Sequence, residues 1–260
     1  MLSHALFGYT GGLKPQGRFA TTHWSLVAAA GGSHTRESAA ALDALCRIYW
    51  YPLYAFVRRA GYDAARAEDS VQAFFVHLFE HDSFAAARQE RGRFRSFLLG
   101  ALKHFLANEY EHGRALKRGG GQTLLSLDVS SGENRYMLEP RDESTPEMLF
   151  ERRWAATLID RVHMQLRTAL VRSGKGALFE QLKDYITGVE DDVSYRDVGS
   201  VVGLSEGAVR VTVHRLRRRF REVLREEIAQ TVSNPAETDA EIEFLLGVLS
   251  RARAGDVSGP

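Results

Sequence analysis

Apolar residues recur at steps of three and four along most of this chain, which is the spacing that gathers them on one face of an α-helix. The pattern predicts helices over 38–60, 64–79 and 94–116, and again over 148–186. Pro52 predicts a kink or a break in the first of these helices. The alternation of apolar and polar residues that is typical of β-strands is nearly absent. We therefore predict an all-α fold.

The helical pattern is interrupted by one long stretch of linker composition. It begins with three consecutive glycines, Gly119 to Gly121, and continues with serine, glycine and proline. We therefore expect two helical domains joined by a flexible linker. The predicted division is a disordered lead-in (1–21), a first helical domain (22–118), a linker (119–147), a second helical domain (148–232) and a tail with a short helix (233–260).

Residues 195–221 carry the most informative pattern, two helices joined by a tight turn. The first helix covers about 195–202, and Gly203 can adopt the left-handed conformation that ends it. Ser205 can cap the second helix by accepting a hydrogen bond from a free backbone N–H. The second helix has one apolar stripe, formed by Val209, Val213, Leu216, Phe220, Val223 and Leu224. Its other faces carry Arg210, His214, Arg215, Arg217, Arg218 and Arg221.

A helix with an apolar seam and an arginine-lined outer side suits the major groove of DNA. Arginine can pair bidentately with guanine and can also bind phosphate. An ordinary surface helix rich in arginine is the alternative, because charge alone does not distinguish the two. The Gly203-Leu204-Ser205 turn and the short helix before it favour a helix-turn-helix.

The formal net charge of +1 at first argues against a nucleic-acid partner. Charge is, however, segregated along the chain. Residues 205–225 hold seven arginines against two acids, and residues 88–118 hold eight basic residues against three acids. Local basic patches, rather than net charge, set the electrostatic footprint on DNA.

The second basic stretch alternates cations with aromatic residues, beginning Arg93-Phe94-Arg95-Ser96-Phe97. Aromatic rings stack on unpaired bases while arginine and lysine hold the backbone, which is a common basis of single-strand binding. We expect Phe94, Phe97 and Phe105 to belong to the core instead. The predicted binding residues are the exposed basic positions Arg88, Arg91, Arg93, Arg95, Lys103, Arg114, Lys117 and Arg118.

Catalytic chemistry is poorly represented, and we predict that the chain is not an enzyme and carries no cofactor. His77 and His81 have the spacing of helical metal ligands, but no third ligand accompanies them, so a solvated helix end is the favoured interpretation. Cys46 is the only cysteine, which excludes an intrachain disulfide and predicts a small buried thiol. No apolar run suits a membrane span or a signal peptide, so we expect a cytoplasmic protein.

Three blocks occur in a characteristic order: AEDSVQAFF at 67–75, FRSFL at 94–98, and the predicted helix-turn-helix. In that order and spacing they resemble a bacterial extracytoplasmic-function RNA polymerase sigma factor. The stretches THWSL at 22–26 and YWYPLY at 49–54 resemble the branch common in Planctomycetes. The resemblance covers about residues 22–232.

The resemblance implies a two-domain initiation factor whose partners are core RNA polymerase and promoter DNA, with an anti-sigma factor as a further candidate. It implies that Asp69, Gln72 and Val76 dock on the polymerase. The loop at 82–92 and the helix after it would melt the minus-ten element and hold a flipped base. The minus-thirty-five element would be recognised by Ser205, Glu206, Arg210, His214, Arg215, Arg217 and Arg218.

Two other functions are compatible with these patterns. A free-standing regulator that binds operator DNA as a dimer would use the same helix-turn-helix, and a metal protein would use the two histidines.

In the tail, Ile242, Leu245, Leu246 and Leu249 form an apolar stripe flanked by acids. This helix is too short to be stable alone, so it should dock. It either covers an apolar patch or neutralises a basic DNA-binding surface.

Overall fold

The computed structural model describes residues 23–30, 36–80, 92–113, 129–139, 144–186 and 195–256. Within these ranges the chain is helical and forms no strand, which confirms the predicted all-α fold class. The helices are α1 (His23–Ala30), α2 (Arg36–Arg59), α3 (Ala64–Glu80), α5 (Phe94–Gly113), α6 (Val129–Met137), α7 (Pro146–Arg172), α8 (Gly176–Ile186), α9 (Tyr195–Val202), α10 (Glu206–Ala229), the short 3-10 helix η2 (Pro235–Glu237) and α11 (Thr238–Asp256).

Helix α2 is the centre of one end of the molecule. Every residue from Ile48 to Val57 is buried, because α1, α3, α6 and α7 all pack against this helix. Pro52 lies inside the helix without breaking it. Cys46 is fully buried, as predicted, and burial raises the pKa of its thiol to about 12.

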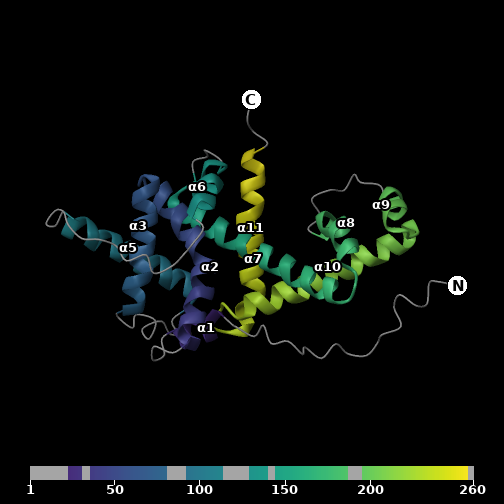
Figure 1. Cartoon of the computed structure of the whole chain (residues 1–260), viewed down its shortest axis with the longest axis horizontal. Helices are drawn as coiled ribbons and strands as arrows, with labels where there is room; N and C mark the ends of the chain where they lie inside the picture. Colours follow the sequence, from purple (N-terminus) through teal and green to yellow (C-terminus); the bar gives the residue numbers. More distant parts are fainter. Residues whose placement is uncertain are drawn as a thin grey trace.

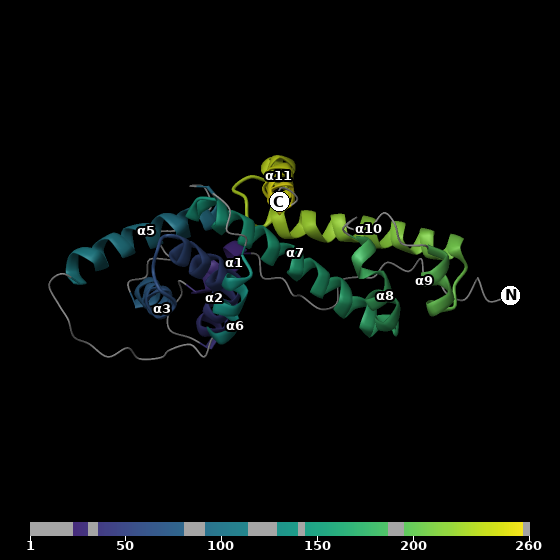
Figure 2. The same cartoon turned by 90° about the horizontal axis from the view of Figure 1, so that it is seen from above.

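Helix α7 joins this end to the other. Its 27 residues span about 40 Å at ~1.5 Å per residue. It packs against α2 as well as against α8 and α10, and α11 crosses it near the middle of the molecule (Figure 1). The same arrangement seen from above places α11 end-on over α7 and α10 (Figure 2).

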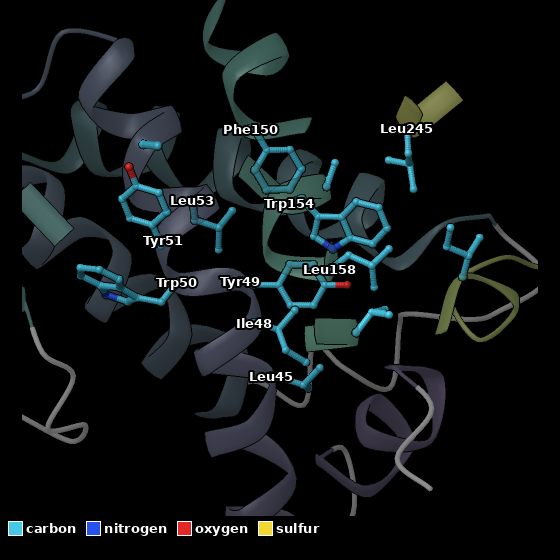
Figure 3. Packing of buried hydrophobic residues seen from close by; sticks show 14 of the residues in the cluster. Leu45, Ile48, Tyr49, Trp50, Tyr51, Leu53, Phe150, Trp154, Leu158 and Leu245 are labelled. Carbon is cyan, nitrogen blue, oxygen red and sulfur yellow. The ribbon is translucent and has the colours of Figure 1, made fainter. Parts of the chain in front are cut away.

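The core is continuous along α7. Tyr49 of α2, Trp154 and Leu158 of α7, and Leu245 of α11 lie together in one buried apolar cluster (Figure 3). This cluster extends to Val209 and Phe220 of α10. The division into two domains therefore stays a prediction, because buried residues of both predicted domains belong to the same cluster.

Within the predicted linker, residues 129–137 form α6, which packs on α2. Glu133 accepts hydrogen bonds from Tyr54 and from Arg58, whose Nη2 lies 2.8 Å from a carboxylate oxygen. Gly132 packs so closely on Trp50 that a Cβ there would lie 2.4 Å from the indole ring. The serine, glycine and proline content suggested a linker. The polar contacts that hold α6 could not be predicted from it, because their partners are distant in the sequence. The glycines at 119–121 and the lead-in at 1–21 lie outside the described residues.

None of the described helices combines the length and the apolar character that crossing a membrane requires.

Candidate nucleic-acid interface

Helices α9 and α10 lie on either side of a turn at Gly203, and their function as a helix-turn-helix stays a prediction. Gly203 has a φ of +70°, the left-handed conformation that ends α9. The Ser205 side chain accepts a hydrogen bond from the backbone N–H of Ala208 over 3.3 Å, which caps α10. Gly199 lies against the turn, where the N–H of Leu204 donates to its carbonyl over 2.9 Å.

Helix α10 separates its apolar and basic residues as the sequence predicts. The whole stripe is buried, namely Val209, Val213, Leu216, Phe220, Val223 and Leu224. Thr212 is also buried, and its hydroxyl donates to the Ala208 carbonyl over 2.8 Å. The residues exposed on the other faces include Ser205, Glu206, Arg210, His214, Arg215, Arg218 and Arg221.

Glu206 organises the exposed cations at the beginning of α10. Its carboxylate lies 3.0 Å from Nη2 of Arg210 and 3.9 Å from Nε of Arg196 in α9. The Arg210 guanidinium also lies 5.5 Å from the centre of the Tyr195 ring. Sequence reasoning missed Tyr195 and Arg196, because their proximity to α10 depends on the angle between the two helices.

Arg217 and Arg218, two of the residues predicted to bind the minus-thirty-five element, contact other groups of the protein. Nε of Arg217 donates to the Tyr185 carbonyl over 2.8 Å, which satisfies an acceptor in the last turn of α8. Arg217 is therefore engaged between two helices rather than fully exposed. Arg218 remains exposed, with its Nε 3.0 Å from a carboxylate oxygen of Glu222 one turn further along.

The prediction that Arg95 is an exposed binding residue is wrong. The Arg95 side chain is 1% exposed and the Glu241 side chain 0%, and the two form an ion pair. Nε of Arg95 also lies 2.7 Å from Glu151 of α7. Its guanidinium lies 4.4 Å from the centre of the Trp154 ring. A helical pattern identifies the face of α5 that carries Arg95, but the carboxylates that bury it come from α7 and α11.

The other described cations of this segment are also paired with carboxylates. Nη2 of Arg93, which is half-buried, lies 2.7 Å from Glu241. Nζ of Lys103 lies 2.5 Å from Glu147 of α7. Phe94 belongs to the core as predicted, whereas Phe97 and Phe105 are only partly buried against it. Outside the described residues lie Arg88, Arg91, Arg114, Lys117 and Arg118.

The predicted docking face of α3 is polar and acidic. Asp69 is exposed, while Gln72 and Val76 are half-buried. Nε2 of Gln72 donates to Glu68 over 3.1 Å. Burial raises the pKa of Glu68, and the charge of Asp69 raises it further. Burial likewise raises the pKa of Glu109 on α5, where Ser70 opposes the shift and Asp69 adds to it.

The described residues contain no group of three histidine, cysteine or acidic side chains that could hold a metal ion. His77 is exposed, with its ring 5.4 Å from the ring of Phe105, and His81 lies outside the described residues.

Comparison of the chain with family models, with curated proteins and with solved structures finds no match. The sigma-factor family is therefore a proposal that depends on the motifs and on the geometry of α3, α5 and α10.

Proposed function

We propose that this protein is a cytoplasmic sigma factor that directs bacterial RNA polymerase to promoters and opens them. The observation that carries the proposal is the segregation of α10 into a buried apolar stripe and an exposed arginine face, directly after a glycine turn and a serine cap. That geometry leaves Arg210, His214 and Arg215 accessible to a base edge or a phosphate.

A second group of cations supports initiation rather than simple operator binding. Arg93 directly precedes α5, and Arg95 and Lys103 lie on that helix. A duplex is recognised by a helix in a groove, whereas an unpaired strand needs cations beside aromatic faces. In this structure these cations are paired with carboxylates of α7 and α11, so single-strand binding would require the pairs to open. A protein that only binds operator duplex has no use for such a group.

The acidic face of α3 is the proposed contact with core polymerase. Asp69 is exposed beside Glu68 and Glu109, so this surface favours a basic partner. It belongs to the helix whose sequence resembles the polymerase-binding segment of the family. An anti-sigma factor would compete for the same surface.

The docking face can be tested by replacing Asp69 and Gln72 together with alanine and measuring association with core polymerase. We expect the dissociation constant to rise by about tenfold or more, because the variant loses a charged and a polar side chain from the proposed contact. A tenfold rise corresponds to a loss of ~1.4 kcal/mol of binding free energy. A matched control is the replacement of Asp184 and Gln181, an exposed pair of the same residue types on α8. The control should bind core enzyme normally, and both variants should keep their helical circular dichroism. Equal binding by the two double variants would remove α3 from the proposed interface.

A further inference from the structure

Helix α11 places a carboxylate between Arg93, which directly precedes α5, and Arg95 in the first turn of α5. The two oxygens of Glu241 each lie within ion-pair distance of a different arginine, at 2.7 Å for Arg93. Neither oxygen has hydrogen-bond geometry with these or other side chains, although the carboxylate is fully buried. The pairing is therefore electrostatic, without the hydrogen bonds that normally hold a buried carboxylate in place.

One turn further along α11, an aromatic ring faces the same two arginines. The centre of the Phe244 ring lies 5.6 Å from the guanidinium carbon of Arg93 and 5.6 Å from that of Arg95. Arg95 is also stacked on Trp154, at 4.4 Å. Residues three apart lie on one face of a helix, so α11 presents an anion and an aromatic face together.

The cluster is neutral only while α11 is docked. It contains two guanidinium groups, from Arg93 and Arg95, and two carboxylates, from Glu151 and Glu241. Without Glu241 it carries one net positive charge, and Arg95 loses the helix that covers it. Two neighbouring arginines can bind a nucleotide of single-stranded DNA, with cations on the phosphate and a guanidinium plane against the base.

We propose that α11 is an internal mimic of a single-stranded nucleotide and that it occupies a nucleotide site formed by Arg93 and Arg95. Glu241 stands in for the phosphate and Phe244 for the base. This inference rests on the proposed function, in which the beginning of α5 binds melted DNA. Release of α11 opens the site, so the tail inhibits single-strand binding until the complex with polymerase or promoter displaces it.

The packing of α11 is suited to such an exchange. Leu245 is buried in the same core cluster as Trp154 and Leu158 (Figure 3). Leu246, by contrast, is 50% exposed. The predicted stripe is therefore wrong at Leu246, and the side of the helix that packs includes Glu241 instead. Arg225 and Asp239 pair on the exposed surface at the beginning of α11. Asp239 and Glu241 share the first turn of α11, so release of Glu241 from the arginines requires the whole of α11 to move, and this exposed pair opposes that movement only weakly.

The test compares two full-length variants that each lose one acid from α11. Glu241→Gln removes the carboxylate from the arginine pair, whereas Glu243→Gln removes an exposed carboxylate from the same helix and serves as the matched control. The probe is a fluorescein-labelled single-stranded DNA oligonucleotide, titrated at several salt concentrations. We expect Glu241→Gln to bind about tenfold more tightly with a steeper salt dependence, because additional phosphate contacts release counterions. Glu243→Gln should bind like the parent protein.

Leu245→Ala should also release α11 from the nucleotide site, because it removes a buried side chain of α11 and leaves every residue of the site in place. Hydrogen exchange of α11 measures the release directly. Tighter DNA binding by both variants, lost again when Arg93 and Arg95 are replaced by alanine, supports the mimic. Faster exchange of α11 without tighter DNA binding would overturn it and leave α11 as a structural brace. Unchanged hydrogen exchange of α11 in both variants would also overturn the mimic. A gain in single-strand binding by a protein that does not associate with core polymerase would refute the sigma-factor proposal and leave the mimic standing.

Discussion

The carboxylate of Glu206 and the guanidinium of Arg210 lie 3.0 Å apart on the first two turns of α10. Both side chains are largely exposed, so the pair contributes little to stability, on the order of 0–1 kcal/mol. Its effect is on conformation, because it holds Arg210 over the Tyr195 ring at the end of α10 that would enter a groove. We therefore propose that Arg210 contacts a base.

Replacing Arg210 with alanine should reduce promoter affinity by roughly 1–3 kcal/mol and relax specificity at one base step. Replacing Arg218 should instead weaken binding to all sequences and flatten the salt dependence, since that residue lies two turns away and would contact phosphate. Binding to a promoter library at several salt concentrations distinguishes the two. If both variants show the same sequence preference and the same salt dependence, the proposal that Arg210 contacts a base and Arg218 a phosphate is wrong.

Gly199 should not tolerate a side chain. A Cβ at this position would lie 2.5 Å from the carbonyl oxygen of Leu204, which is too close for any real contact. We expect Gly199→Ala to lower the free energy of unfolding by about 1–3 kcal/mol, as overpacked sites do. Gly207→Ala is the matched control, because nothing lies within 4 Å of a Cβ there.

The control should be neutral or slightly stabilising, by up to ~1 kcal/mol, since alanine favours a helix more than glycine does. Urea denaturation of both variants measures the difference. Equal stabilities would mean that the turn after α9 is looser than the structure describes.

Stability should fall when the protein is acidified through the range in which histidine titrates. Burial against Phe220 lowers the pKa of His163, while Asp160 and Asp184 oppose the shift. The unfolded chain therefore takes up this proton at a higher pH than the folded chain. The stability that the neutral ring contributes is present above about pH 6.5 and is lost as the pH falls through the folded pKa.

His163→Gln should remove that part of the pH dependence, whereas His104→Gln, at an exposed position on α5, should keep it. Urea midpoints measured between pH 5 and pH 8 provide the comparison. An unchanged pH profile in His163→Gln would show that other groups control the acid transition.

The sequence predicted the helices well where one apolar face decides the structure. Residues 195–202 and the cap at Ser205 are confirmed because the glycine turn, the cap and the apolar stripe all act locally. Helix α6 was not predicted, because Glu133 and Arg58 meet across 75 residues and composition carries no sign of such a pairing. The burial of Arg95 was missed for the same reason. Helical periodicity identifies a face, but it does not reveal which distant carboxylate will cover it.

We propose that this chain gives core polymerase the ability to find and open promoters. The most direct measurement combines core RNA polymerase from the source organism with the protein on a library of genomic DNA fragments, followed by permanganate footprinting of unpaired thymines. We predict discrete transcription starts with reactive thymines near the minus-ten position, and only when core enzyme and protein are both present. Binding to duplex DNA by the protein alone, with no opening and no new transcripts when core enzyme is added, would contradict the claim and favour a free-standing regulator.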